Sequence, residues 1–446
     1  MKKFVWYCLL ILAAVSMLAG CGSRGEEQDT SDETTTAENI ELNLWYTDES
    51  MTAYMSEAAE AFGRENQVAV IPRQISAIDY LENINQQNIA ETDIVDVYIL
   101  NSESLEKAYM AGLAAPLWEE LAGYPDVAVS ACRYQGKGIA FPVYFETEYF
   151  LYNKDIVSEP PASFQAIIDF ASSDEMSGEN AELYQNLEAV LKWDVLDLFC
   201  NYQFVGAYLN LGGPDGDDRT VVDMNNENVL NALGFYKELN QSLYFDGEEV
   251  QYDALLQSFL EGRILYTIGT TRSLELLRQN GMNYGIAPIP PLTDSLDSRG
   301  ISVNYVAVVN PYSRSTVLSE RLAAYLSDEY AEKCYDLSGK LPCKRLSTYP
   351  AEEFVHVMDA YERSVVLPKL MDTTNFWVEL EVVLNNIWKA EMREELAEEG
   401  LSDISQADNM GAEEIKKEQM RKQIRDLVTG EISRAHEQMK QQLSRQ

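Results

Sequence analysis

An alternation of strand and helix patterns near the start of the chain restricts the fold more than any other feature. Three short runs are apolar or alternate as strands do, and they are residues 40–45, 68–71 and 96–100. Three helical patterns lie between and after them, at 51–66, 80–90 and 101–111. The order strand, helix, strand, helix, strand predicts an α/β region with a largely parallel sheet.

The carboxyl ends of these strands carry side chains that are able to contact a ligand. In open sheets of this kind ligands bind beyond the carboxyl ends of the strands. The candidates are Trp45, Tyr46, Thr47, Asn101, Ser102 and Glu103. Residues 101–103 can equally serve only as the cap of the following helix, so both roles stay open there.

The remainder of the chain continues the α/β character and then becomes mostly helical. A long β-rich run covers 138–154, and further strands are predicted at 264–268 and 284–290. Helices are predicted at 163–171, 182–198, 226–239, 319–327, 328–337, 376–399 and 412–442. The sequence has no internal repeat beyond the strand–helix alternation.

The N-terminus has the composition of an export signal. Lys2 and Lys3 precede an apolar run over 4–18, which is too short to span a bilayer comfortably, since ~20 residues are needed. The end of this segment, Leu18-Ala19-Gly20-Cys21, looks like a bacterial lipoprotein signal, which implies cleavage before Cys21 and lipid on that cysteine. An ordinary signal peptide with an incidental cysteine is the alternative. Residues 22–39 are polar and acidic, which predicts a flexible tether.

The charge balance excludes one class of partner. The chain has 73 acidic and 34 basic residues and a formal net charge of −39, so we expect it to repel nucleic acid and anionic lipid. Such acidity also favours a soluble monomer. About 425 residues remain after the signal, which suggests two lobes. Cys132, Cys200, Cys334 and Cys343 remain in that portion, and their disulfide state is open.

Material for catalysis is scarce in this sequence. It has only two histidines, His356 and His436, and no nucleophile-elbow, phosphate-loop or HExxH pattern. Asp215, Asp217 and Asp218 lack the full spacing of a calcium loop, and a solvated turn is the simpler interpretation. We therefore expect no metal and no cofactor.

Five stretches in order form a recognisable pattern: 141–155 ending in Tyr-Asn-Lys-Asp, Leu-Gly-Gly at 211–213, 231–237 ending in Phe-Tyr-Lys, 259–268, and 283–290 with its Tyr-Gly and prolines. Together they resemble the extracellular solute-binding proteins of ABC importers, specifically the maltose-binding-like sugar-binding family. The resemblance runs from about Ile40 to Lys389.

This resemblance implies an α/β fold of the type II periplasmic-binding-protein kind, with two lobes, a ligand cleft between them and three chain crossings. We expect the crossings near Tyr144, Ser302 and Cys343. The N-lobe would comprise 40–144 plus 303–343, and the C-lobe 145–302 plus 344–446. The implied function is a lipid-anchored, extracytoplasmic receptor that captures a sugar and delivers it to membrane permease subunits.

The resemblance also indicates ligand contacts within the later part of the chain. Flat side chains suit the C–H face of a sugar, and carboxylates or amides suit its hydroxyls. The candidates are Tyr144 and Glu146 at the first crossing, Tyr202, Thr271, Arg272, and Trp377 with Glu381 one turn later. Trp377 matches the stacking tryptophan of the family. Thr271 can instead serve only as a helix cap, and Arg272, which stands where some members have an aromatic residue, leaves open a charged ligand.

Two other functions remain as alternatives. Glu146 and Glu148 share one face of a predicted strand about 7 Å apart, a separation compatible with a surface glycoside hydrolase. Both acids lie on one strand, however, so no opposing group brackets a sugar. A sensor or structural lipoprotein of the same fold is the second alternative.

Overall fold

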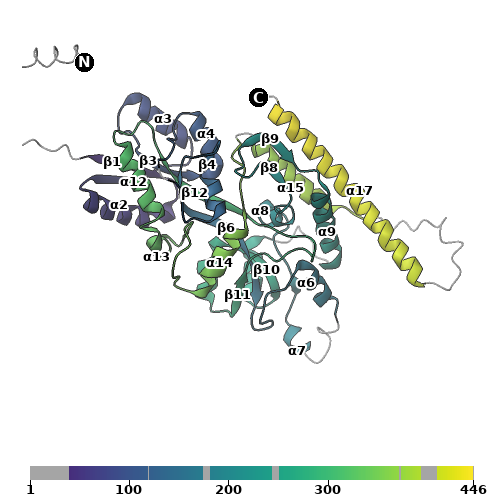
Figure 1. The fold of residues 1–446 in the computed structure, drawn as a ribbon. Helices are drawn as coiled ribbons and strands as arrows, with labels where there is room; N and C mark the ends of the chain where they lie inside the picture. The colour runs from purple at the N-terminus through teal and green to yellow at the C-terminus, as the bar shows by residue number, and fades with distance from the viewer. Residues whose placement is uncertain are drawn as a thin grey trace, which may run out of the picture. The chain divides into compact units, whose positions relative to one another are not determined.

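The computed structural model describes residues 40–118, 120–173, 181–243, 251–370, 373–392 and 409–444. These residues belong to one compact unit of the chain, and the predicted signal, Cys21 and the tether lie outside them. Among the residues described, no helix combines the length and the apolar character needed to cross a membrane. Figure 1 gives the arrangement of the elements.

One mixed sheet connects most of the strands. Its path runs β2 (Ala69–Gln74), β1 (Glu41–Tyr46), β3 (Val97–Asn101), β12 (Ile301–Val309), β6 (Phe141–Asn153), β10 (Ile264–Thr270) and β7 (Ala189–Leu191). Three strands lie off this path: β11 (Tyr284–Ala287) and β13 (Leu341–Pro342), which pair with β6, and β14 (Val365–Val366), which pairs with β12. Two small hairpins are separate from the sheet, β4–β5 (Arg133–Tyr134, Lys137–Gly138) and β8–β9 (Asn210–Gly212, Asp218–Asp223).

The sheet contains both parallel and antiparallel pairs of strands. β1 pairs in parallel with β2 and β3, which confirms the parallel sheet predicted for the first strands. β12 is antiparallel to both β3 and β6, and β10 is antiparallel to β6. The antiparallel neighbour of β3 comes from a segment some 200 residues later, so a local pattern could not reveal it.

The strand β6 belongs to two groups of strands. Its residues 141–147 pair with β12, whereas 148–153 pair with β10 and β11. All 13 of its residues are buried. The exchange of partners falls between Glu146 and Glu148, so the two acids lie where the two groups meet.

Helices that pack on the first group of strands are α2 (Thr52–Asn66), α3 (Tyr80–Ala90), α4 (Leu105–Met110), α12 (Thr316–Ser327) and α13 (Cys334–Ser338). They gather around the purple and blue strands in Figure 1. In α2 the side chains of Tyr54, Met55 and Phe62 follow helical spacing and are buried against Leu44 and Val97. Each such large apolar side chain contributes roughly 1.5–3 kcal/mol when fully buried.

Helices around the second group of strands are α5 (Asp126–Ala131), α6 (Phe164–Ala171), α7 (Ala181–Tyr184), α8 (Leu198–Asn201), α9 (Glu227–Leu243), α10 (Tyr252–Leu260), α11 (Leu274–Asn280), α14 (Glu352–Arg363) and α15 (Thr373–Lys389). Their core includes an aromatic cluster of Trp193, Phe204, Tyr236 and Trp388, with neighbouring ring centroids 4.7–5.7 Å apart. The largest cluster of the second group is separate from the two clusters of the first group. A further cluster combines Phe145 and Leu341 with side chains of α10, α11 and α14, so it connects the two groups.

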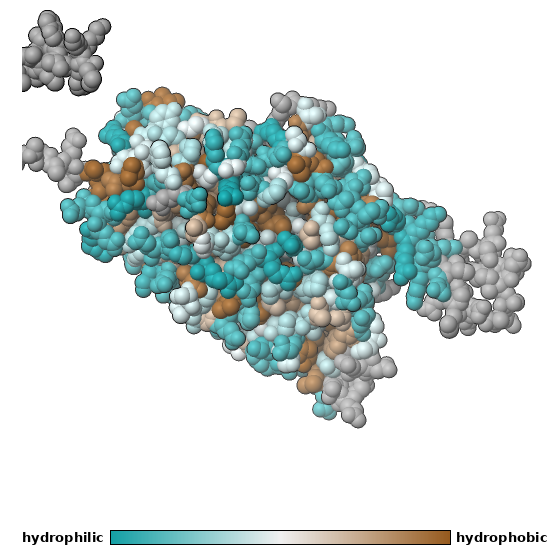
Figure 2. All heavy atoms as spheres, in the orientation of Figure 1, coloured by the Kyte–Doolittle hydropathy of each residue, from teal (hydrophilic) through white to brown (hydrophobic). Residues whose placement is uncertain are grey.

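The last described helix is α17 (Asn409–Ser444), which packs on α15, α9 and β9. Figure 1 shows it in yellow along one side of these elements, and its visible surface is largely hydrophilic (Figure 2). Its buried side chains recur every three or four residues, at Ile424, Val428, Ile432, Ala435 and Met439. The amphipathic helix predicted at 412–442 is confirmed.

Three expected helices change. The helix predicted at 376–399 ends at Lys389, and residues 393–399 lie outside the described part of the chain. The helix predicted at 328–337 is reduced to a 3-10 turn at Ala331–Lys333 followed by α13. The helix predicted at 182–198 is wrong, because this segment contains the end of α7, then β7, and only the first residue of α8. β7 pairs with β10 at Ala189 and Leu191, so sheet pairing overrides the local helical pattern. The disulfide state of the cysteines was left open, and in the structure Cys132, Cys200, Cys334 and Cys343 are all buried free thiols. Burial raises the pKa of the Cys334 thiol to about 12.

Candidate functional site

Four charged side chains meet where β6 changes partners. Lys340 Nζ donates to Glu146 Oε1 at 2.8 Å and lies 3.4 Å from Asp48 Oδ2. Arg272 Nη2 donates to Glu146 Oε2 at 2.9 Å, and the Tyr144 hydroxyl donates to Asp48 Oδ2 at 3.1 Å. We call Asp48, Glu146, Arg272 and Lys340 the charged quartet.

The two acids of the quartet are held in their ionised forms. Burial alone would raise the pKa of Glu146, but hydrogen bonds and charges from Lys340 and Arg272 outweigh burial and lower that pKa. Burial likewise opposes ionisation of Asp48, whereas hydrogen bonds from Ser50, the Lys340 charge and the Tyr144 hydroxyl lower its pKa. At neutral pH these groups are hydrogen-bond acceptors only.

Glu148 has a different environment, although the sequence paired it with Glu146. Only 1% of its surface is exposed, and its Oε1 accepts from Ile301 N at 3.1 Å. Its Oε2 is buried without a hydrogen-bond partner, and burial raises the pKa of this carboxyl well above its usual value. A solute cannot reach it, which removes the second carboxylate that a glycoside hydrolase at this position requires.

Three predicted contacts come together at a cavity of about 220 Å³. Trp377 Nε1 donates to Glu103 Oε1 at 2.9 Å, and the ring centroid of Tyr202 is 5.9 Å from that of Trp377. The cavity is lined by Glu103, Leu198, Phe199, Tyr202, Ile301, Leu367 and Trp377. Trp377 lies in the second turn of α15, whose neighbouring side chains Phe376 and Leu380 are buried in the core. This packing fixes the position of the indole.

A second cavity of about 300 Å³ contains three more of the predicted polar contacts, Glu146, Thr271 and Arg272. Its lining residues are Glu146, Thr147, Asp197, Phe199, Tyr252, Thr270, Thr271, Arg272 and Val303. Thr271 Oγ1 accepts from Thr147 N at 3.3 Å, and the Arg272 side chain is 75% exposed. Phe199 lines both cavities, so the aromatic and the charged parts of the site are neighbours.

The carboxyl ends of β1 and β3 border a third cavity, of about 460 Å³. Thr47 and Asn101 line it together with Tyr80 and Tyr305. Thr47 and Asn101 therefore lie together beyond the carboxyl ends of β1 and β3, where ligand contacts were expected. Asn101 Oδ1 also accepts from Ser104 N, so the predicted cap is confirmed as well. Ser102 is fully buried next to it.

Several other candidates lie in the core or at the surface. Trp45 is 5% exposed with its ring 6.4 Å from that of Tyr80, and Tyr46 is 3% exposed. Tyr144 is buried and stacks on Tyr305 with ring centroids 4.4 Å apart. Glu381 is exposed on α15. Of these residues, Tyr144 contacts the quartet directly, and Trp45 and Tyr46 line none of the three cavities.

Sequence reasoning missed Lys340, and it did not select Asp48, Phe199 or Tyr305. Lys340 follows Gly339 and precedes the apolar run 341–343, at the boundary predicted near Cys343. A lysine beside a predicted crossing was the available signal. Nothing local indicates that it reaches acids almost 200 and 300 residues away.

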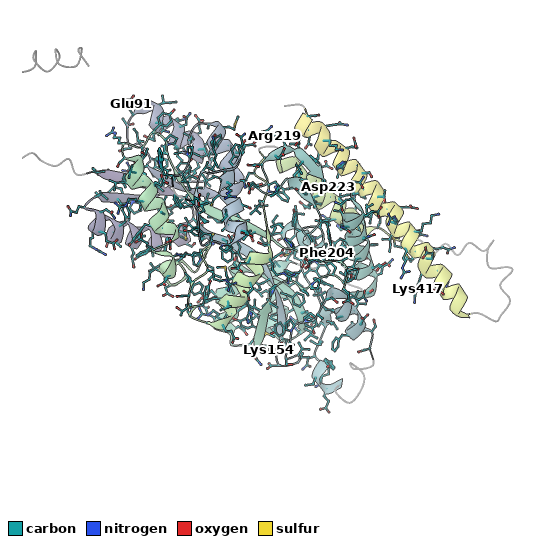
Figure 3. The ribbon with its side chains drawn as sticks, in the orientation of Figure 1. Glu91, Lys154, Phe204, Arg219, Asp223 and Lys417 are labelled. Carbon is teal, nitrogen blue, oxygen red and sulfur yellow. The ribbon has the colours of Figure 1, made fainter. Side chains whose placement is uncertain are left out.

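A second contact, away from the quartet, joins the β8–β9 hairpin to α4, which packs on the first group of strands. Arg219 of β9, labelled in Figure 3, donates to Glu106 Oε1 of α4 at 3.0 Å, and Tyr134 donates to the same oxygen at 3.1 Å. Glu106 is 1% exposed, so this ion pair is largely shielded from water. Within the described part of the chain no group of three or more metal-ligating side chains occurs. Asp218 accepts from Thr220 in its own turn.

Solved structures define the class of this fold. An extracellular solute-binding protein of Staphylococcus aureus in complex with maltose superposes with a TM-score of 0.70 at 16% identity, covering 88% of this chain and 97% of that chain. A maltose-binding periplasmic protein of Listeria monocytogenes, also in complex with maltose, has a TM-score of 0.66 at 16% identity, covering 89% and 99%. The chain therefore has the mixed α/β fold of maltose-binding proteins.

The chain belongs to the bacterial extracellular solute-binding protein family, whose sequence profile matches residues 57–344. The predicted resemblance is confirmed, and because this is a family of binding proteins and not of enzymes, the glycoside hydrolase alternative is set aside.

Curated relatives include a maltodextrin-binding protein of Bacillus subtilis, 22% identical over 58% of this chain and 64% of that protein, so just under two thirds of its length is matched. A galactooligosaccharide-binding protein of the same organism is 23% identical over 85% of this chain and 91% of that protein. A maltooligosaccharide ABC transporter solute-binding lipoprotein of Streptococcus pneumoniae is 21% identical over 82% and 88%.

Proposed function

We propose that this protein is the lipid-anchored substrate-binding subunit of an ABC importer, which captures a neutral or charged sugar or oligosaccharide outside the cell. Relatives whose names specify maltodextrin, galactooligosaccharide and maltooligosaccharide support this ligand class. The observation that carries the proposal is the convergence of Trp377, Tyr202 and Glu103 on one cavity beside the charged quartet. Flat rings cover the C–H face of a sugar, and acids accept its hydroxyls.

The mechanism we propose is closure of two lobes on the ligand. The N-lobe would be 40–144 plus 303–343 and the C-lobe 145–302 plus 344–446, with crossings near Tyr144, Ser302 and Cys343. The largest hydrophobic cluster of the second group, which is separate from the clusters of the first, and the exchange of partners along β6 support this division. A few backbone dihedrals at such crossings suffice for a hinge.

Ligand contacts are proposed on both lobes. Trp377 stacks on the sugar, and Glu103, Glu146, Thr271 and Arg272 bind its hydroxyls. Thr47, Asn101, Ser102, Tyr144, Tyr202 and Glu381 are further candidates, with Trp45 and Tyr46 behind them in the core. Closure brings the contacts of both lobes onto one ligand. Because the ligand then binds the closed form more tightly than the open form, it shifts the protein toward the closed form.

We also propose that lipid on Cys21 holds the protein at the outer face of the cytoplasmic membrane, with residues 22–39 as the spacer. The closed, liganded form then docks on the permease subunits of the importer. The name of the pneumococcal relative, an ABC transporter solute-binding lipoprotein, supports both statements.

The decisive measurement is isothermal titration calorimetry of the purified protein against maltose, maltotriose and galactobiose, with amino acids and divalent metals as other solute classes. We expect at least one sugar to bind, and Trp377→Ala to weaken it by about 10–100-fold, as loss of a stacking aromatic typically does. Trp118→Ala is the matched control, because Trp118 is 86% exposed and lines neither of these cavities.

Binding of amino acids or metals with no response to any sugar would refute the ligand class. Uptake of the bound sugar by cells that lack this protein separates an importer subunit from a sensor. An importer subunit is required for uptake, whereas loss of a sensor lipoprotein leaves uptake by the permease intact.

A further inference from the structure

Lys340 is held in place from both sides along the chain. Gly339 ends α13 with a φ of 71°, a conformation that suits glycine, and Leu341 and Pro342 then pair with Phe145 and Tyr144 of β6. The backbone of Lys340 is thus fixed between a helix end and a strand. Its side chain is 20% exposed, so it is directed inward and largely shielded from water.

The ammonium group of Lys340 connects acids from two distant parts of the chain. Nζ lies 2.8 Å from Glu146 Oε1, which is on β6, and 3.4 Å from Asp48 Oδ2, just beyond β1. It also lies 5.8 Å from the ring centroid of Tyr144, whose hydroxyl donates to the same Asp48 oxygen. Lys340 is thus the one member of the quartet that contacts both acceptors, while Ser50 and Tyr144 also hold Asp48 and Arg272 also holds Glu146.

The charged quartet is balanced. Arg272 pairs with Glu146 Oε2, and Lys340 pairs with Glu146 Oε1. The two negative charges of Asp48 and Glu146 are therefore matched by the two positive charges of Lys340 and Arg272. The other titratable groups that influence this cluster are the Tyr144 and Tyr305 hydroxyls, the Cys334 thiol near Lys340 and the exposed Asp197 near Arg272. Asp197 is exposed, so solvent screens it from the quartet, but it also lines the cavity that contains Glu146 and Arg272.

A balanced cluster favours one class of ligand. Each ionised carboxylate has about four lone-pair positions, so sugar hydroxyls can donate to the free positions without displacing Lys340 or Arg272. Arg272, which is 75% exposed, keeps N–H groups for sugar oxygens. A ligand carboxylate in a closed site would instead need a cation, whereas both cations of the quartet are already paired with acids. Two further acids, Glu103 and Asp197, line the neighbouring cavities and would repel such a carboxylate.

We propose that Lys340 is a positioning and specificity-determining residue of the solute site, which holds Asp48 and Glu146 as ionised hydroxyl acceptors and balances them, so that the site takes an uncharged sugar. This inference rests on the proposed function, and it narrows that function to neutral ligands over sugar acids.

The test compares the full-length wild type with Lys340→Gln and Lys340→Arg. The control is Lys344→Gln, which removes a lysine four residues after Lys340 that pairs with Asp328. Calorimetry uses maltotriose and trigalacturonate. We expect Lys340→Gln to weaken maltotriose binding by about 10–100-fold, the usual effect of losing charge-assisted hydrogen bonds, with partial rescue by Lys340→Arg and no change in the control. Wild type should bind trigalacturonate at least about tenfold more weakly than maltotriose.

A second readout needs no ligand. Carbon-13 carboxyl NMR should show the titration midpoints of Asp48 and Glu146 rising in Lys340→Gln and unchanged in Lys344→Gln, an effect that a merely structural lysine would not have. Unchanged midpoints in Lys340→Gln overturn the positioning role. Equal or tighter binding of trigalacturonate overturns the neutral class. Absence of binding to every sugar would instead refute the proposed function, and the midpoints would still decide the role of Lys340.

Discussion

Replacing Glu148 by glutamine should make the protein more stable, and increasingly so as the pH rises. The Glu148 side chain is buried, its Oε2 has no hydrogen-bond partner, and its pKa lies well above the usual 4.5. The folded protein therefore keeps a proton on this acid under conditions in which the unfolded chain has lost it. Glutamine has the same shape and no proton to lose.

The sign and size of the effect follow from proton linkage. Because the folded-state pKa is raised, the free energy of unfolding of the wild type falls as the pH rises from about 4.5 to that pKa, by about 1.4 kcal/mol per pH unit. Glu148→Gln lacks this loss. Its advantage over wild type should grow at this rate until the pH passes the folded-state pKa and then level off. Below pH 4.5 the two proteins should differ little.

The measurement is urea unfolding at pH 4.5, 5.5, 6.5 and 7.5, with the difference between variant and wild type taken at each pH so that general charge repulsion cancels. Glu146→Gln is the matched control, two residues away on the same strand. Its pKa is lowered, so its contribution is present above the unfolded pKa and lost as the pH falls through the folded pKa. Glu146→Gln should cost about 1.5–3 kcal/mol at pH 7 and progressively less in acid. A pH-independent difference for Glu148→Gln would refute the assignment of a protonated, buried acid.

Three further predictions concern packing and the thiols. Gly285→Ala should lower the free energy of unfolding by about 1–3 kcal/mol, because its Cβ would lie 2.0 Å from Cζ of Tyr152, and urea unfolding measures this. Gly430→Ala should raise it by about 0.5–1 kcal/mol, because the added methyl meets nothing within 4 Å and alanine favours the helix α17; a loss of stability there would contradict this packing. The four buried cysteines should react with a thiol reagent only on unfolding, and rapid labelling of the folded protein would contradict their burial.

The sequence by itself determined most of the local structure. Strands β1, β2 and β3, the helices α2 and α3, the cap at Asn101 and the amphipathic α17 all follow patterns that act over a few residues. Side-chain periodicity and capping are local properties, so they can be read without knowing the fold. The order of five short stretches was sufficient to indicate the family. Glu103 was predicted separately, from the end of a strand, and Tyr202 and Trp377 as aromatic side chains suited to a sugar.

Tertiary structure alone decided which of these residues share a site and in which charge state. Glu146 and Glu148 are equivalent in the sequence. In the structure Lys340 and Arg272 lower the pKa of Glu146, whereas burial raises the pKa of Glu148, which accepts from Ile301 N. Lys340 gained its role from acids that are 194 and 292 residues away. The segment 182–198 became partly strand because β10 lay beside it. Hydrogen bonding, burial and charge depend on what the folded chain brings within a few ångströms, and separation along the sequence does not record that.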